Sequence, residues 1–190
     1  YLVEYAKRGN RFVELIRLTA ETLSGIPSIV YGLFGLLFFV TYLGWGYSLI
    51  AGAATLSIMI LPLIMRTTEE ALKSVPDTYR EASFGLGAGR LRTIFRIVLP
   101  AAVPGILAGV ILAVGRIVGE TAALIYTAGT VAQMPESIMS SGRTLALHMY
   151  TLSSEGLHTN EAYATAVVLL LLVLGINTVS AMIAKRVTKI

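Results

Sequence analysis

Three long stretches of this chain lack any charged residue, and no other feature constrains its fold as strongly. They cover residues 26–43, 48–65 and 162–184. An α-helix needs roughly 20 apolar residues to cross the hydrocarbon core of a membrane. Of the 190 residues, 55% are hydrophobic and 14% are charged, whereas about 25% are charged in a soluble domain. This composition excludes a disordered tail, a coiled coil and an ordinary cytosolic enzyme. It predicts an all-α, polytopic membrane protein surrounded by membrane lipid.

A fourth span is expected within residues 99–135, where the only charges are Arg116 and Glu120. As one helix this segment would be about 55 Å long at ~1.5 Å per residue, well beyond a hydrocarbon core of ~30 Å. We therefore expect one crossing helix over about residues 102–124, followed by a bent or re-entrant segment. The sequence thus predicts about four transmembrane helices in a single membrane domain, residues 1–190.

The basic residues predict the orientation of these spans, because cytoplasmic loops carry an excess of Lys and Arg. Thirteen of the 15 Lys and Arg residues fall on one side of the predicted membrane. They are Lys7, Arg8, Arg11, Arg17, Arg66, Lys73, Arg80, Arg90, Arg92, Arg96, Lys185, Arg186 and Lys189. Both chain ends and the loop 66–98 are therefore expected in the cytoplasm, and residues 130–161 form an outer loop. Because these residues lie beside apolar spans rather than in one patch, no nucleic-acid partner is expected.

The cytoplasmic loop 66–98 contains more sequence signals for regular structure than a simple connection between two spans requires. The start of a helix is predicted by a cap, a first-turn proline and a capping-box acid, which are Ser74, Pro76 and Asp77. This helix should stop at Gly87 or Gly89, and a second amphipathic helix should follow over residues 90–98. Two short helices joined by a glycine turn form a rigid surface, which is best explained by a partner that docks on it.

One pattern within this loop resembles a known motif. Glu81-Ala82-Ser83 is followed after three residues by Gly87, and after nine more by Ile97-Val98-Leu99-Pro100. This resembles the cytoplasmic "EAA" loop of binding-protein-dependent ABC importer permeases, with Ser83 in place of the second alanine. The resemblance implies a coupling helix that fits a cleft on the ATPase subunit, with Glu81 and Ala82 at the contact and Gly87 at the turn. Ser83 is small enough to preserve close packing. The alternative is a surface helix without a partner.

The similarity extends along nearly the whole chain to the PstA-type permeases of phosphate importers. The stretches that carry it are residues 21–35, 61–62, 66–71, 75–81, 115–122 and 143–150. The resemblance implies an inner-membrane protein of six spans with both ends in the cytoplasm, of which this chain would contain the last four. It also implies a permease subunit for inorganic phosphate. Its implied partners are a homologous second permease, two ATP-binding cassette ATPase subunits and an extracytoplasmic phosphate-binding protein.

The two intramembrane charges need separate treatment, because a charge at mid-bilayer costs roughly 2.5–3.5 kcal/mol. Arg116 and Glu120 are four residues apart, so on one helix they share a face and are expected to pair. Thr121 adds a hydroxyl donor, and a guanidinium with neutral donors suits a phosphate. Two interpretations stay open. Either these three residues line the substrate path, or the ion pair only fixes helix packing.

Several further patterns limit the function. The chain has no Gly-Lys dipeptide and therefore no P-loop, so ATPase activity is expected in partner subunits. It has no cysteine, and His148 and His158 lie in the outer loop without a third ligand, so no metal or cofactor is expected. Gly105 and Gly109 form a small-residue pattern that predicts a close helix contact. The open alternatives are a permease for another oxyanion, such as molybdate or sulfate, and a structural or regulatory membrane subunit that does not transport.

Overall fold

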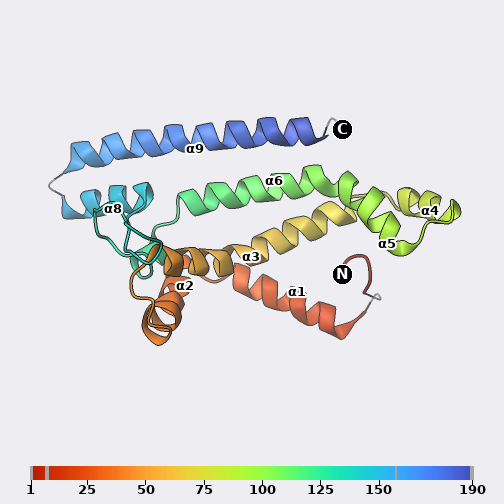
Figure 1. The fold of residues 1–190 in the computed structure, drawn as a ribbon, viewed down its shortest axis with the longest axis horizontal. Helices are drawn as coiled ribbons and strands as arrows, with labels where there is room; N and C mark the ends of the chain where they lie inside the picture. The colour runs from red at the N-terminus through yellow and green to blue at the C-terminus, as the bar shows by residue number, and fades with distance from the viewer. Residues whose placement is uncertain (1, 7–8, 157, 189–190) are drawn as a thin grey trace. The chain divides into compact units, whose positions relative to one another are not determined.

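The computed structural model describes residues 2–6, 9–156 and 158–188, and every regular element in these ranges is helical (Figure 1). The elements are α1 (Arg11–Ser24), α2 (Ser28–Gly35), η1 (Leu36–Tyr42), α3 (Leu49–Lys73), α4 (Asp77–Gly85), α5 (Arg90–Thr93), η2 (Ile94–Val98), α6 (Leu99–Val118), α7 (Ala122–Ile125), α8 (Leu145–Glu155) and α9 (Thr159–Thr188). The segments η1 and η2 are π-helical. The predicted all-α fold is confirmed. Lys7, Arg8 and Lys189, which entered the orientation argument, lie outside the described residues.

Within the part of the chain that the structure describes, three helices are long and apolar enough to cross a membrane, namely Leu49–Lys73, Arg90–Val118 and Thr159–Arg186. A fourth span is obtained only if Arg11–Ser24 and Ser28–Tyr42 are counted together across the break between them. By itself Ser28–Tyr42 is about 22 Å long at ~1.5 Å per residue, which is shorter than the ~30 Å core. The predicted number of four spans is therefore the upper limit for this structure.

The chain divides into two compact units. Unit 1 comprises Tyr1–Ser24, Leu61–Ala113 and Thr178–Ile190, and unit 2 comprises Gly25–Ile60 and Val114–Asn177. The two units are described separately below.

In unit 1 the second part of α3 packs closely against the first part of α6. A Cβ atom added at Gly105 would lie 2.7 Å from the Cβ of Ala71, and one added at Gly109 would meet the side chain of Thr67. The predicted small-residue contact of these glycines is therefore confirmed. Next to it lies an apolar core formed by Ala71, Val75, Val98 and Ala102, with Leu72 and Ile106 packed against it.

The connection from α3 to α6 differs from the prediction in two respects. First, Pro76 occupies the N-cap position of α4 and no side chain caps the helix. The Ser74 hydroxyl instead donates to the Ala71 carbonyl at 2.9 Å, and Asp77 accepts from Arg80. The predicted capping box is wrong, because the end of α3 and an arginine take up both side chains.

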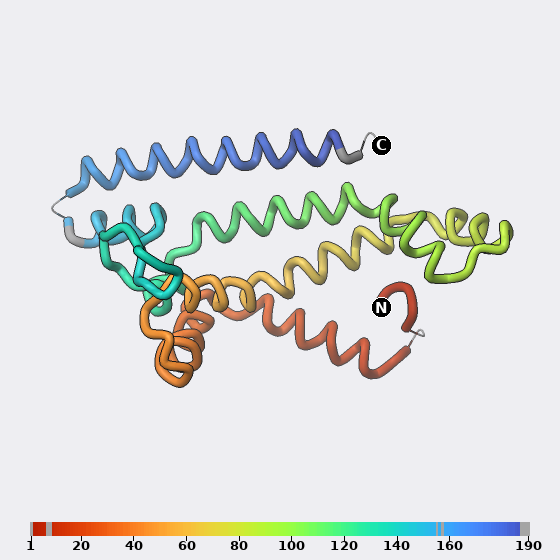
Figure 2. Tube along the Cα trace, in the orientation of Figure 1, coloured from red at the N-terminus to blue at the C-terminus, as the bar shows by residue number. Residues whose placement is uncertain are grey.

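Second, the predicted helix over residues 90–98 is not a separate element. It continues directly into α6, so that Arg90–Val118 forms one helical run (Figure 2). Pro100 has no N–H group for the helix ladder, and the wider π turn of η2 lies directly before it. We attribute the continuity of the helix to this wider turn, which accommodates the proline without a break.

In unit 2, α2 packs against α7, and glycines make the approach possible. A Cβ atom added at Gly32 would lie 2.9 Å from the Cα of Ala123. Gly35 lies directly against the side chains of Thr55 and Thr127, which are both fully buried. Each threonine hydroxyl donates to the carbonyl four residues earlier in the chain, at 2.8 Å. The hydroxyl groups of both threonines therefore have hydrogen-bond partners. The contact with Gly35 is limited by the space available for a side chain at that position.

The end of α6 lies earlier than predicted. The sequence indicated one helix over about residues 102–124, but α6 ends at Val118 and the four-residue helix α7 begins at Ala122. Gly119 lies in the break, and glycine is a poor residue for a helix interior. The span therefore ends sooner than predicted, and a bent or re-entrant course for the segment after it stays a prediction.

The segment predicted as the outer loop, residues 130–161, contains the helix α8. Thr144 caps this helix by accepting a hydrogen bond from the Leu147 N–H at 3.3 Å. Residues 137–140 also supply partners for the start of α3, where backbone N–H groups have no partner within the helix. Leu49 donates to the Ser140 carbonyl and Ile50 to the Ile138 carbonyl, at 3.1 and 3.0 Å. This loop is therefore part of the packed structure of unit 2.

Candidate functional site

The residues predicted for ATPase coupling lie on α4 and on the turn that follows it. Glu81 and Ala82 are exposed, whereas Ser83 is buried. Gly87 has a φ of +80°, in the left-handed region that favours glycine. Its N–H donates to the Phe84 carbonyl at 2.9 Å, which closes the turn after the helix. The backbone therefore presents Glu81 and Ala82 on the outer side of a closed helical turn.

Ser83, the position that departs from the family pattern, joins α4 to α5. Its hydroxyl forms a 2.8 Å hydrogen bond with the hydroxyl of Thr93, and both side chains are almost completely buried. Thr93 also donates to the Gly89 carbonyl at 3.3 Å. Thr93 belongs to no motif recognisable in the sequence. Ser83 indicates that such a residue exists, because a buried hydroxyl needs a hydrogen-bond partner.

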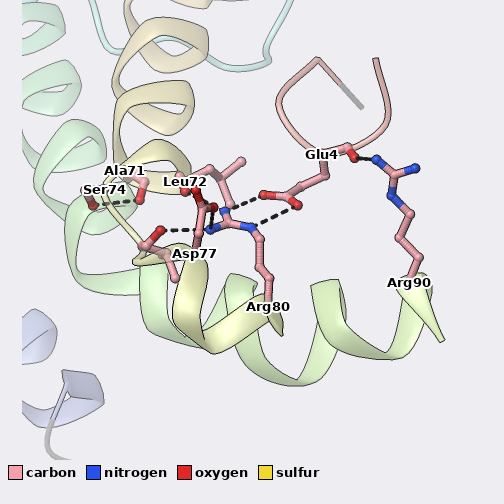
Figure 3. Close-up of polar contacts among 8 residues, drawn as sticks. Glu4, Ala71, Leu72, Ser74, Asp77, Arg80 and Arg90 are labelled. Atoms are coloured by element: carbon pink, nitrogen blue, oxygen red, sulfur yellow. Dashed lines mark hydrogen bonds and ion pairs between the residues drawn. The ribbon is translucent and has the colours of Figure 1, made fainter. Parts of the chain in front are cut away.

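Arg80 connects the segments of this loop with one another. In the sequence alone it is one of many basic residues. Its guanidinium lies at the junction of three segments (Figure 3). It donates to the Leu72 carbonyl at the end of α3 at 3.1 Å, and to the Val75 carbonyl at 2.8 Å. It also contacts Asp77 on its own helix at 3.1 Å. Because the last carbonyls of a helix have no partner within the helix, Arg80 both satisfies the end of α3 and fixes α4 next to it.

Glu4, in the segment before α1, completes this arrangement. Its two carboxylate oxygens accept hydrogen bonds from Arg80 at 2.7 and 3.3 Å. The side chains are 12% and 15% exposed, so this ion pair is largely withdrawn from solvent. The hydrogen bonds to Glu4 raise the pKa of Arg80. Arg90 joins the same segment, since it donates to the Glu4 carbonyl and lies 4.9 Å from the centre of the Tyr5 ring.

The intramembrane residues Arg116, Glu120 and Thr121 lie around the break between α6 and α7. Arg116 is in the last turn of α6, but Glu120 lies beyond the end of that helix. No ion pair joins them within the described chain. The predicted pairing on one helix face is therefore wrong, because the helix ends at Val118.

These three side chains instead have different surroundings. The Glu120 carboxylate accepts from the Ala123 N–H at 3.3 Å, at the start of α7. The Thr121 hydroxyl donates to the Gly119 carbonyl at 3.3 Å. Arg116 is an electrostatic neighbour of Tyr31, a buried residue of α2. Arg116 is thus not neutralised by Glu120 and stands at the C-terminal end of a helix, where the dipole favours a cation.

The two histidines, His148 and His158, lie in the segment predicted as the outer loop. His158 forms a 3.4 Å pair with Glu161. Among the residues described by the structure, no group of three or more His, Asp or Glu residues could hold a metal ion.

Comparison with known proteins places this chain in a protein family. Residues 2–189 match the family described as "Binding-protein-dependent transport system inner membrane component". The probable ABC transporter permease protein YqgI of Bacillus subtilis is 41% identical over 170 residues, which cover 83% of this chain and 58% of that protein. The phosphate transport system permease protein PstA 1 of Mycobacterium tuberculosis is 37% identical over 186 residues, covering 96% and 60%. The chain thus spans less than two thirds of the length of these relatives.

A solved structure shows the same fold. The MetNI methionine ABC transporter in an inward-facing conformation aligns with a TM-score of 0.78 over 98% of this chain and 83% of the other, at 21% identity. The family match over residues 2–189 shows that the chain belongs to the binding-protein-dependent transport system inner membrane components, the permease components of ABC importers.

Proposed function

We propose that this chain is a membrane-spanning part of an ABC importer permease that moves inorganic phosphate inward across the cytoplasmic membrane. Three relatives are named as phosphate permeases of the PstA type, at 37–47% identity. The proposed partners are a homologous second permease, two ATPase subunits that supply the energy, and an extracytoplasmic phosphate-binding protein. In the proposed orientation both ends of the chain and residues 66–98 face the cytoplasm, and residues 130–161 form the outer loop.

The observation that carries the importer role is the way α4 is exposed on one side and fixed on the other. Glu81 and Ala82 face outward, and three large apolar side chains nearby are also exposed: Tyr79, Phe84 and Leu86. Arg80 and Ser83 hold the other side through buried contacts. Exposed apolar groups on a rigid helix are typical of an interaction surface. We assign this surface to the ATPase subunit, with Gly87 holding the turn that ends it.

Co-purification of the assembled complex tests this assignment. Glu81→Lys combined with Gly87→Val should release the ATPase subunit, because the first change alters the contact and the second strains a left-handed turn. Glu21→Gln is the matched control, since Glu21 is an exposed carboxylate on α1. Retention of the ATPase by the double variant would contradict the docking assignment.

The proposed substrate path contains Arg116, with Glu120 and Thr121 shaping the break beside it. A guanidinium that is not paired with Glu120 suits a phosphate, because its fork donates to two oxygens at once. We expect Arg116→Gln to abolish phosphate uptake while the complex still assembles. Loss of assembly would assign Arg116 to helix packing instead.

The identity of the oxyanion is tested by ATPase stimulation in the reconstituted complex. Phosphate with its binding protein should stimulate hydrolysis, whereas molybdate and sulfate with theirs should not. If only molybdate or only sulfate stimulates ATP hydrolysis, that anion rather than phosphate is the substrate.

A further inference from the structure

The segment before α1 contacts the loop between α3 and α6, which carries the proposed coupling helix. The EAA-type motif does not explain these contacts. Glu4 and Arg80 are 76 positions apart in the sequence, yet two hydrogen bonds connect them. A second connection runs from Arg90 to the backbone carbonyl of Glu4 and to the Tyr5 ring. The segment thus contacts both sides of the glycine turn, since Arg80 belongs to α4 and Arg90 begins α5 (Figure 3).

The contacts described above between this segment and the loop are hydrogen bonds and a cation–π contact. A cavity of about 570 Å³ adjoins the segment and is lined by side chains of the segment itself, of α1 and of residues 73–90. Seven of these side chains are ionisable. Because charged side chains line this cavity, we expect the Glu4–Arg80 pair to determine the position of the segment.

We propose that Glu4 is a positioning residue that sets the orientation of α4 through Arg80. This inference rests on the proposed docking of α4 on an ATPase subunit. Arg80 has other partners in Leu72, Val75 and Asp77, but all of them lie within eight residues of it in sequence. Among the residues described by the structure, Glu4 alone connects Arg80 to a distant segment. A push on α4 is thereby transmitted to the segment before α1 as well as to α3.

The decisive readout is the number of phosphate ions transported per ATP hydrolysed by the reconstituted complex. Glu4→Gln retains the size of the side chain but removes the charge that Arg80 binds. Because charged hydrogen bonds are about twice as strong as neutral ones, we expect this ratio to fall about threefold, with the ATPase subunits still bound. Glu4→Asp retains the carboxylate and should restore most of the ratio.

Glu14→Gln is the matched control, because it removes the same charge from the lining of the same cavity. Glu14 is exposed and forms no ion pair within the described chain. Its transport ratio should equal that of the unaltered complex. An equal ratio in the Glu4→Gln and Glu14→Gln complexes would overturn the positioning role.

Hydrogen exchange of residues 77–85 in the nucleotide-free complex provides a second measurement. Exchange should be roughly tenfold faster in Glu4→Gln than in Glu14→Gln, as expected when a charged hydrogen bond is lost. This measurement does not depend on docking. Therefore, if the Glu81 and Gly87 variants disprove docking, faster exchange still supports the pair. Unchanged exchange would refute the pair even if docking is correct.

Discussion

The connection between α3 and α6 in unit 1 is fixed by charges and hydroxyl groups, whereas the helices of unit 2 meet through glycines. Arg80 and Ser83 each form directed polar contacts in unit 1. In unit 2, Gly32 lies against Ala123 and Gly35 against Thr55 and Thr127, whose hydroxyls donate to carbonyls four residues earlier in the chain. Removing one partner atom breaks a polar contact, whereas adding side-chain volume disrupts close packing. We therefore expect unit 1 to be destabilised by substitutions that remove a polar group, and unit 2 by substitutions that enlarge a glycine.

The largest loss of stability is expected for Arg80→Ala. This change removes five hydrogen bonds and leaves Glu4 withdrawn from solvent without its partner. The free energy of unfolding in mixed micelles should fall by roughly 2–4 kcal/mol, slightly less than for a completely buried pair. Arg92→Ala removes an exposed arginine of α5 and should change it by less than about 0.5 kcal/mol. Equal effects of the two variants would show that unit 1 does not depend on this cluster.

Gly35→Ala should affect unit 2 through volume alone. The added methyl group would meet Thr55 and Thr127, which are fully buried and cannot move into solvent. Overpacking of this kind costs about 1–3 kcal/mol, measurable by the same unfolding experiment. Gly175→Ala, at a helical position with open space around it, should instead be neutral or stabilising by up to about 1 kcal/mol. A tolerated Gly35→Ala would contradict the assignment of close packing to unit 2.

Thr93→Val tests the hydroxyl pair of unit 1 while retaining the shape of the side chain. It leaves the Ser83 hydroxyl buried without its partner, at a cost of about 1–2 kcal/mol. The double variant with Ser83→Ala should recover most of that loss, because no hydroxyl is then left unsatisfied. A double-mutant cycle on the free energy of unfolding measures this coupling. Additive losses would mean that the two hydroxyls act independently.

The smallest effect is expected for Glu70→Gln, which removes the ion pair with Arg66. Both side chains are more than 60% exposed, and such pairs within a helix contribute about 0.3–0.5 kcal/mol. The loss should disappear at high salt, because solvent ions screen exposed charges. A loss as large as that for Arg80→Ala would show that burial does not distinguish the ion pairs of unit 1.

A glycine turn and a contact between small residues could be predicted from the sequence, whereas the polar contacts between distant residues could not. The turn at Gly87 and the contact of Gly105 follow from residue type and spacing, which are visible in a short stretch. The pair of Glu4 and Arg80 was missed because nothing in a single sequence relates two positions so far apart. Arg80 was one of thirteen basic residues used for orientation, and that use concealed its structural role.

The end of α6 was missed for a different reason. Apolar composition continues past Gly119, and hydropathy alone cannot distinguish a continuing span from a break within it. The spacing of Glu120 from Arg116 predicts an ion pair, although a carboxylate is equally suited to the first N–H groups of a new helix, such as α7. The candidate site was therefore predicted in its residues but not in their mutual contacts.

The hydrogen bond between Ser83 and Thr93 has an evolutionary consequence. The buried Ser83 hydroxyl has Thr93 as its partner, whereas Thr93 also bonds to the Gly89 carbonyl. Relatives that carry serine in place of the second alanine should therefore keep a hydroxyl residue at the position of Thr93. What looks like a neutral departure from a family pattern is then one half of a covarying pair, inherited together across the glycine turn.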